Sequence, residues 1–341
     1  MKFSRHGLED LNGLTTLAKS TYASGEIISE DYLDWEYKLN PSGKAMVFVV
    51  ESESQLVSQY VVLPKKLVLE NKIISGTLSL NTITHPGYRG RGYFTQLAEM
   101  TYSECETNGV DFTIGFPNAN SVNGFLSKLK FVEIGRLPLL IKLINPLNSV
   151  VSFISKGSSR YGKEIELIPV SENKGVSKFD LVSDAGKYNA FWDKFKERHP
   201  IVSDRSTEFL KWRYIDIPLR KYQLFKFEVG GEIVGIAILR LKEIMGMRCG
   251  VLVDFLVLDT AIDVNFFFSE LKKSKLDLFF ATVPVATMEF EVLQKAGFFK
   301  VPEFLMLKKL HVIIRKHNKN ISDSICDFKK WFITFGDYDI F

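Results

Sequence analysis

The chain has 341 residues, with 44 Lys and Arg against 40 Asp and Glu, so that its formal net charge is +4. At a typical size of about 150 residues per domain, this length predicts two domains. A hydrophobic fraction of 46% with only 11 prolines excludes a disordered or low-complexity protein. The small and balanced charge argues against nucleic acid as a partner, because duplex recognition needs clustered cations.

The cysteines and the apolar segments bear on the cellular compartment. Cys105, Cys249 and Cys326 stand far apart and in no CxxC or metal-ligand spacing, which predicts reduced thiols and no metal site. The N-terminal segment MKFSRHGLEDLNGL lacks the apolar core of a signal peptide. No apolar run approaches the roughly 20 residues that a membrane helix needs. We therefore expect a cytoplasmic protein with no membrane partner.

The first half of the chain begins with helical spacing and then changes to the period of strands. In chain order we expect helices at residues 6–22 and 31–39, strands at 45–52, 55–64 and 72–84, a Gly-rich loop at 85–92, a helix at 95–109, a strand at 110–117, a helix at 121–130 and a strand at 138–144. Such an order is typical of a mixed sheet with helices packed against it.

The second half repeats this order after a connection that we place in the Ser-, Gly- and Lys-rich residues 145–190. The expected elements are helices at 188–198 and 207–214, a hairpin of strands 222–229 and 232–242 turned by Gly230 and Gly231, a strand at 248–258, a helix at 265–274, a strand at 277–283, a helix at 288–298 and a closing strand at 304–310. The repetition predicts two tandem copies of one α+β fold with a mixed α/β sheet, in domains of residues 1–145 and 146–341.

The segment HPGYRGRGYF, residues 85–94, joins a strand to a helix and carries the sharpest chemical signal in the chain. Its glycines let the backbone approach a ligand closely, and the unpaired N–H groups at a helix start bind anions. Arg89 and Arg91 add positive charge. The segment has neither the GxxxxGKS/T spacing of a P-loop nor the setting of a Rossmann turn. It predicts a pyrophosphate cradle, with an ordinary tight turn as the alternative.

This segment resembles the coenzyme A-binding motif of the GNAT N-acyltransferase superfamily, written Q/R-x-x-G-x-G/A. Arg89, Gly92 and Phe94 fall on its three defining positions, and the last departs from the motif because Phe replaces Gly or Ala. The resemblance covers about residues 1–144. It implies an acyl-CoA domain with this mixed fold.

The resemblance also implies the coenzyme contacts. In that family the strand before the loop, here Thr82 to Thr84, splays from its neighbour and hydrogen-bonds the pantetheine arm. The positions carried over to this chain are Thr82, Ile83, Thr84, Arg89, Gly90, Arg91, Gly92, Tyr93, Phe94, Asn118, Ser121 and Phe125. Acyl-CoA is thus the expected co-substrate, and no metal is expected.

The second half is similar to the same fold by element order and by the sequence Ala296-Gly297-Phe298. Its segment VLDTAIDVNFF contains no Arg-Gly-x-Gly, so we interpret it as a degenerate copy that has lost coenzyme binding and supplies the acceptor pocket. Tandem chains of this kind resemble the nucleotide-sugar N-acyltransferases, which act on dTDP-linked amino-dideoxyhexoses for bacterial surface polysaccharide such as lipopolysaccharide O-antigen. Residues 198–218 and 331–341 carry this second resemblance.

Acyl transfer to an amine needs a polarised carbonyl, a neutral amine and a thiolate that can leave. We predict direct attack by the amine without a covalent enzyme intermediate. Many GNAT enzymes place a Tyr on the short helix to protonate the thiolate, but this chain has Asn123-Gly124-Phe125-Leu126 there. Another residue or solvent is left as the acid, or the thiolate leaves unprotonated.

Three places offer a base for the amine. Asp254 interrupts an apolar strand, and its alternative role is that of a paired structural carboxylate. His199 has an ordinary pKa near 6.5, although a lone loop histidine is also commonly incidental. Asp337 and Asp339 lie in the terminal GDYD, with an exposed tail as the alternative.

Four side chains offer planar donors and stacking faces for a nucleotide diphosphate, namely Arg205, Trp212, Arg213 and Tyr214. The two aromatic residues among them would equally suit a core. The predicted function is transfer of an acetyl or 3-hydroxybutanoyl group from acyl-CoA to the amine of a dTDP-linked amino sugar. The alternatives are an acetyltransferase for another amine, such as an antibiotic or a peptide, and a non-catalytic acyl-CoA sensor. The sequence leaves open whether the chain forms a homodimer.

Overall fold

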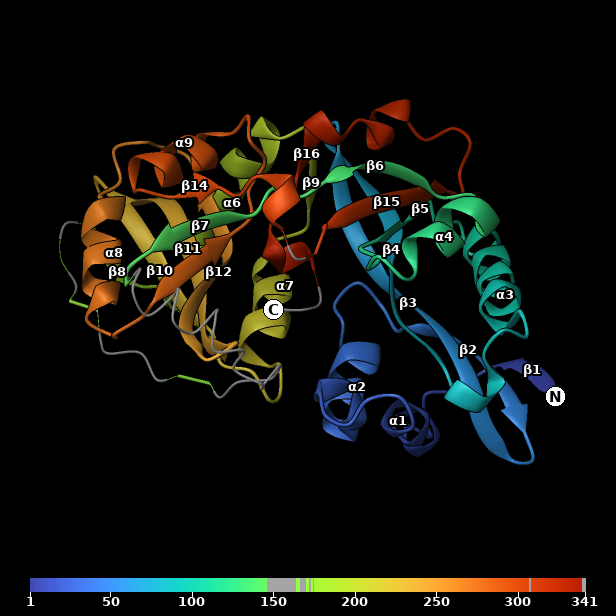
Figure 1. Cartoon of the computed structure of the whole chain (residues 1–341). Coiled ribbons are helices and arrows are strands. Elements are labelled where there is room, and N and C mark those ends of the chain that lie inside the picture. Colours follow the sequence, from blue (N-terminus) through green and yellow to red (C-terminus); the bar gives the residue numbers. More distant parts are fainter. Residues whose placement is uncertain (146–163, 166–169, 172, 174, 307, 339–341) are drawn as a thin grey trace. The chain divides into compact units, whose positions relative to one another are not determined.

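The computed structural model of the chain describes all residues except 146–163, 166–169, 172, 174, 307 and 339–341. The chain forms two compact units that interleave along the sequence (Figure 1). Unit 1 comprises Met1–Arg136, Asp216–Leu219 and Lys308–Lys330, and unit 2 comprises Leu137–Ile215, Arg220–Leu307 and Trp331–Phe341. The sequence analysis expected contiguous halves with a boundary at residue 145.

Unit 1 is built on a sheet with helices on both faces. Its strands are β1 (Lys2–Arg5), β2 (Met46–Ser52), β3 (Gln55–Leu69), β4 (Lys72–Thr84), β5 (Phe112–Gly115), β6 (Val132–Arg136) and β15 (His311–Lys316), and its helices are α1 (Asn12–Lys19), α2 (Glu30–Lys38), α3 (Tyr93–Thr107) and α4 (Val122–Lys128). The strand order is β1-β2-β3-β4-β5-β15-β6, in which the β4–β5 pair is parallel and the other pairs are antiparallel.

The core of unit 1 lies between this sheet and helices α3 and α4. On α3 the buried residues Leu97, Ala98, Tyr102 and Cys105 recur at helical spacing, so one stripe of the helix faces the sheet. Helix α1 packs on the opposite face, where its Leu17 and Ala18 contact Ile83 of β4. Strand β4 is therefore held from both faces.

Unit 2 repeats the architecture. Its strands are β7 (Leu140–Leu143), β8 (Val176–Lys178), β9 (Ile201–Ser203), β10 (Gln223–Val229), β11 (Glu232–Ile244), β12 (Met247–Val257), β13 (Leu278–Ala281), β14 (Phe299–Lys300) and β16 (Trp331–Phe332), and its helices are α6 (Ala185–Arg198), α7 (Thr207–Leu210), α8 (Val264–Lys272) and α9 (Met288–Lys295). The strand order of its sheet is β14-β7-β13-β12-β11-β10-β8, in which the β12–β13 pair is parallel and the other pairs are antiparallel. Strands β9 and β16 lie outside this sheet and pair with each other in parallel.

The two sheets have the same order of strands, which confirms the predicted mixed α/β fold and its internal repeat. They exchange one strand, however (Figure 1). Strand β7, expected to end the first sheet, lies between β13 and β14 of the second, and β15 lies between β5 and β6 of the first. The prediction of a strand at residues 304–310 is wrong, because Glu303–Leu305 form a short 3-10 helix and strand β15 begins at His311. A hydrophobic pattern predicts which face of a strand is buried and does not specify the sheet that it joins.

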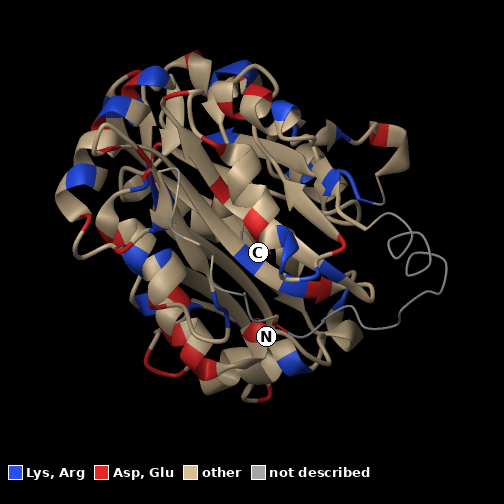
Figure 2. Cartoon of the chain, turned by 90° about the vertical axis from the view of Figure 1, so that its left-hand side faces the viewer, with Lys and Arg blue, Asp and Glu red and all other residues tan. Residues whose placement is uncertain are grey.

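Figure 2 shows basic and acidic residues interspersed over the helices and strands, in keeping with a formal net charge of +4. None of the helices in the described part of the chain has both the length and the apolar character needed to span a membrane.

Candidate functional site

Strands β4 and β5 pair over a short stretch and then part. Gly76–Ser79 of β4 pair with Phe112–Gly115 of β5, and β4 continues to Thr84 beside β3. The N–H of His85 donates to the carbonyl of Val57 at 2.9 Å. Because donors alternate in direction along an antiparallel strand, the N–H of Thr84 points away from β3, toward the side on which β5 lies. The diverging half of β4 thus presents backbone donors to a ligand.

A β-bulge at Asn81 bends β4 where it leaves β5. The β3–β4 register shifts between Gln59 and Val61, and Asn81 adopts a left-handed conformation with φ of 49°. Its side-chain amide donates to Glu36 Oε2 at 2.6 Å and to the Tyr37 hydroxyl at 3.0 Å, and its carbonyl accepts from Gln59 Nε2 at 2.9 Å. Asn81 was not predicted from the sequence. The sequence signal for the bulge was the Asn itself, because Asn is uncommon in strands and tolerates the left-handed conformation.

The loop after β4 has the backbone that an anion cradle requires. Gly90 and Gly92 have φ of 78° and 80°, which side chains with a Cβ rarely adopt. Gly92 directly precedes α3, so the first-turn N–H groups of this long helix open onto the exposed residues 89–92. Earlier in the loop, the His85 ring Nδ1 accepts from the N–H of Gly87 at 3.2 Å.

Two arginines brace the same loop. Arg89 Nε donates to the Thr84 carbonyl at 3.3 Å, and an Arg91 terminal nitrogen donates to the Gly87 carbonyl at 3.3 Å. The Arg91 guanidinium also lies 4.7 Å from the centre of the Tyr88 ring. Both arginines are exposed, so the loop combines unpaired helical N–H groups with two cations. This combination suits a diphosphate.

Phe94, the position that departs from the motif, is directed into unit 1. Its ring centre lies 5.8 Å from that of Tyr60 and 5.3 Å from that of Phe125 on α4. A Cβ built on Gly124 would lie 3.2 Å from the Phe94 ring, so α4 makes room for this ring with a glycine. The large residue at 94 and the small residue at 124 therefore compensate each other. Tyr93 is buried beside Phe3, so only its backbone faces the loop.

The residues predicted after β5 organise the start of α4. Asn118 Oδ1 accepts from the N–H groups of Asn120 at 2.9 Å and Ser121 at 3.2 Å. Ser121 is the residue before α4, and Phe125 is buried against Phe94. These contacts give Asn118 and Ser121 a role in turning the chain into α4.

A chain of hydroxyl groups lies where β4 and β5 diverge, and the sequence analysis missed it. Ser79, the last residue of β4 that pairs with β5, has its hydroxyl 2.8 Å from that of Tyr60. Tyr60 is hydrogen-bonded in turn to the hydroxyl of Tyr102 on α3. Burial raises the pKa of both tyrosines, which therefore remain protonated. Ser79 is half-buried and is linked to two proton-bearing phenols.

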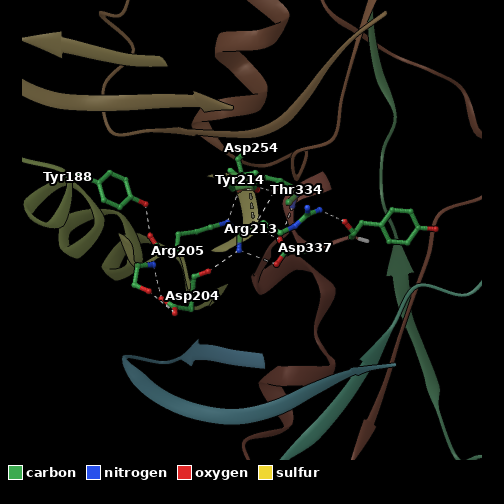
Figure 3. A network of polar contacts seen from close by, with 11 residues as sticks. Tyr188, Asp204, Arg205, Arg213, Tyr214, Asp254, Thr334 and Asp337 are labelled. Carbon is green, nitrogen blue, oxygen red and sulfur yellow. Dashed lines mark hydrogen bonds and ion pairs between the residues drawn. The ribbon is translucent and has the colours of Figure 1, made fainter. Parts of the chain in front are cut away.

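In unit 2 several predicted residues meet in one buried polar cluster around Arg205 (Figure 3). Arg205 Nε and one terminal nitrogen donate to the two carboxylate oxygens of Asp254 at 3.0 and 3.2 Å, and that nitrogen also donates to Asp337 Oδ2 at 2.9 Å. The hydroxyls of Tyr214 and Thr334 donate to Asp254. Arg205, Asp254 and Asp337 are exposed by 1%, 0% and 3%, so water does not compete for these bonds.

The contacts of Asp254 favour the paired structural carboxylate over the base. Both carboxylate oxygens of Asp254 accept hydrogen bonds. Burial alone would lower the pKa of Arg205, but Asp254 and Asp337 hold that pKa well above its ordinary value. Burial and Asp254 likewise raise the pKa of the Tyr214 phenol. The cluster ties Thr334 and Asp337, near the end of the chain, to strand β12. Asp339 lies outside the described residues.

The remaining predicted residues of unit 2 are engaged in packing. His199 packs against Phe195 and Phe332 with tilted rings, whose centres lie 4.6 and 4.5 Å from that of the imidazole. Burial together with Arg198 lowers the pKa of the imidazole to about 4.

Besides Arg205, the predicted nucleotide-binding side chains are Trp212, Arg213 and Tyr214, which lie on the π-helical turn Lys211–Ile215 and are buried. Trp212 packs against Phe209. Arg213 donates to the Tyr222 hydroxyl and to the Tyr338 carbonyl, each at 3.1 Å. These contacts hold the C-terminal segment to unit 2. Nowhere in the described part of the chain do His, Cys, Asp and Glu gather in a group that could hold a metal ion.

Comparisons with known proteins bear on the fold and on unit 1. Residues 10–128 match a family model described as "Acetyltransferase (GNAT) domain". A search of curated protein sequences gave no match. Among solved structures the chain is similar to a GCN5-related N-acetyltransferase from Anabaena variabilis, with 12% identity and a TM-score of 0.65 over 93% of this chain and 73% of that one.

Two further structures share the fold. A probable N-acyltransferase from Enterococcus faecalis has 10% identity and a TM-score of 0.64, covering 92% of this chain and 72% of its own. The N-myristoyltransferase of Saccharomyces cerevisiae with bound myristoyl-CoA has 11% identity and a TM-score of 0.62, covering 92% of this chain and 82% of its own. The chain thus shares the fold of these proteins, and its residues 10–128 match the GNAT acetyltransferase domain.

Proposed function

We propose that the protein transfers an acyl group from acyl-CoA to an amine, with unit 1 binding the coenzyme. One observation carries the proposal: β4 leaves β5 after Ser79, bends at the Asn81 bulge and leads into the two left-handed glycines before α3. The diverging backbone suits the amide groups of pantetheine, and the open start of α3 suits the diphosphate. The match of residues 10–128 to the acetyltransferase family supports this assignment.

In this mechanism the amine attacks the thioester directly. Backbone N–H groups on the diverging part of β4 polarise the carbonyl oxygen, and the positive end of α3 stabilises the coenzyme's negative charge. The attacking nitrogen releases a proton, and the Ser79 hydroxyl relays it: Ser79 gives its own proton to the departing thiolate and takes up the one from the nitrogen. Tyr60 orients the Ser79 hydroxyl through their 2.8 Å hydrogen bond. No cysteine is needed, and burial raises the pKa of Cys105 and Cys249 to about 12, so these two thiols stay protonated.

The proposed acceptor is the amine of a dTDP-linked amino-dideoxy sugar, with unit 2 supplying acceptor-binding groups. Its support is the resemblance over residues 198–218 and 331–341. The structure buries Arg205, Trp212, Arg213 and Tyr214 in contacts within unit 2, so these side chains would shape the acceptor site by holding its backbone. Other amines, including antibiotics and peptides, and a sensor without turnover stay as alternatives.

Thiol release tests the proposal. Acetyl-CoA and 3-hydroxybutanoyl-CoA are each incubated with a panel of dTDP-amino sugars, aminoglycosides, polyamines and peptides, and free coenzyme A is measured. Release with a dTDP-amino sugar supports both the reaction and the acceptor. Release with only another amine keeps the reaction and rejects the sugar. Coenzyme binding without release from any acceptor would favour the sensor.

A further inference from the structure

Unit 2 contains counterparts of both groups of backbone donors in the unit 1 site. Strand β12 pairs in parallel with β13 over Cys249–Leu252 and then continues to Val257. The β11–β12 register shifts between Ile238 and Leu239, so β12 has its bulge directly after Leu252, where it leaves β13. Helix α8 follows β12 as α3 follows β4. Strands β4 and β12 therefore leave their parallel neighbours and bend at the same point of the fold.

Val257 is the counterpart of Thr84. The N–H of Leu258 donates to the Val234 carbonyl at 2.7 Å, as that of His85 does to Val57 in unit 1. By the alternation of an antiparallel strand, the N–H of the preceding residue points to the other side in each unit. The N–H of Thr84 thus faces the side on which β5 lies, and the N–H of Val257 faces the side on which β13 lies.

In unit 2, Glu289 already accepts a hydrogen bond from this donor, the N–H of Val257. Its Oε1 accepts from the N–H of Val257 at 3.0 Å, and the residue is only 1% exposed. It projects from the first turn of α9, whose start is capped by the Thr287 hydroxyl. Its other oxygen, Oε2, is buried without a hydrogen-bond partner among the described residues. Glu289 is thus enclosed between α9 and β12, with the Val257 N–H as the donor to its Oε1.

Asp263 accepts from the second group of donors, the N–H groups at the start of α8. It directly precedes α8, and its Oδ1 accepts from the N–H of Phe266 at 2.8 Å. Helix α3 instead follows Gly92, which has no side chain with which to cap the helix. A carboxylate at a helix start satisfies the same N–H groups and the same dipole that a phosphate would.

We propose that Glu289 and Asp263 are internal substitutes for the coenzyme in unit 2, so that each chain binds one acyl-CoA, through unit 1. The proposal rests on the proposed coenzyme site of unit 1. Each carboxylate accepts from the backbone donor whose counterpart in unit 1 is offered to a ligand. A free coenzyme would have to displace two acceptors that are tethered beside those donors and therefore always present at high effective concentration.

Coenzyme stoichiometry and amide hydrogen exchange test this assignment in the full chain. Titration with coenzyme A is expected to give one bound molecule per chain. The coenzyme should slow exchange at Thr84 and in the first turn of α3, and should leave Val257 and Phe266 unchanged. Two molecules per wild-type chain, or slower exchange at Val257 on adding coenzyme, would overturn the proposal.

Variants of Glu289 add a readout that needs no coenzyme. Glu289→Ala removes the acceptor and should speed exchange of the Val257 amide about tenfold or more. Glu289→Gln keeps an acceptor oxygen of the same shape and should leave that rate within about threefold of wild type. If Glu289→Ala leaves Val257 as protected as before, the proposal is wrong. If wild type binds no coenzyme, the proposed function fails, whereas the Val257 comparison still tests Glu289.

Discussion

At the scale of single residues, the structure separates the side chains at the diverging strands of unit 1 from those buried in unit 2. Ser79 stands half-buried at the divergence of β4 and β5, within hydrogen-bonding distance of Tyr60. Asp254, by contrast, is fully buried and accepts bonds from Arg205, Tyr214 and Thr334. The first position suits proton transfer to a ligand, and the second suits the attachment of one chain segment to another.

Ser79→Ala should lower kcat for thiol release about tenfold and leave KM for acyl-CoA nearly unchanged, because only proton donation to the thiolate is lost. Ser75→Ala is the matched control, since Ser75 lies on the same strand but on its exposed, earlier part. Steady-state kinetics on both variants decide the point. An unaltered kcat in Ser79→Ala would show that solvent protonates the thiolate or that it leaves unprotonated.

Asp254→Asn should destabilise the protein by about 3 kcal/mol, because it leaves the buried Arg205 without one of its two carboxylates. The kcat of the folded variant should stay within about twofold of wild type, since a structural role does not touch the reaction. Denaturant unfolding and kinetics are compared with Asp193→Asn, an exposed carboxylate on α6 of the same unit. A drop in kcat of a hundredfold with unchanged stability would instead identify Asp254 as the base.

The same residues show what sequence reasoning could find. The strand-to-helix turn with left-handed glycines at residues 85–94 was predictable because glycine at such a junction has a direct physical meaning. Arg205, Tyr214, Asp254 and Asp337 were each singled out, yet they meet as a structural cluster. A polar residue in an apolar strand indicates that it has a partner, but its position in the sequence does not name that partner.

At the scale of elements, local rules placed most helices and strands but not their irregularities. The strand at 72–84 was expected, and the helix expected at 95–109 begins two residues earlier, at Tyr93. The bulge at Asn81 that bends the strand was not expected. A bulge depends on the register with the neighbouring strand, which a single segment does not contain. In both units this bulge stands where the strand leaves its parallel neighbour, so the bent strand belongs to the repeated fold.

The contact between α9 and β12 predicts a pH dependence of stability. Burial raises the pKa of Glu289 from 4.5 to about 7, opposed by smaller effects that include the N–H of Val257, the Thr287 hydroxyl and the charge of Arg198. The folded state therefore keeps a proton that the unfolded state loses between pH 4.5 and 7. This contribution to the free energy of unfolding is fully present below pH 4.5 and falls, by about 3 kcal/mol in all, as the pH rises through 7.

Glu289→Gln has no such proton to lose. The difference in free energy of unfolding between this variant and wild type should therefore move in favour of the variant from pH 5 to pH 8, as measured by urea unfolding at each pH. A difference that stays constant across this range would contradict the burial of a titrating carboxyl group at this position.

At the scale of the whole molecule, the two units share one order of strands and exchange one strand each. Strand β15 pairs with both β5 and β6, so the first sheet is interrupted without it. Strand β7 fills the corresponding place between β13 and β14. The sequence predicted the repeat from the order of elements, but the exchange depends on pairings between segments more than a hundred residues apart. Such pairings leave no local trace in either segment.

The exchange predicts how fragments behave. Residues 1–145 alone lack β15 and should fail to unfold cooperatively, whereas the same fragment co-expressed with residues 146–341 should form a complex that copurifies through a tag on one piece. Circular dichroism and size-exclusion chromatography follow both. A cooperative fold of residues 1–145 on their own would show that β15 is dispensable for unit 1.

The most direct test of the central claim is the affinity for coenzyme A of wild type and two glycine variants. Gly90 in the cradle and Gly109 beyond the other end of α3 have φ of 78° and 69°, and a Cβ built on either meets nothing within 4 Å. Both alanine variants thus carry similar backbone strain, but only Gly90→Ala changes the proposed diphosphate site. We expect Gly90→Ala to weaken binding about tenfold or more, and Gly109→Ala to bind like wild type. Equal affinity of all three proteins would contradict coenzyme binding at this loop.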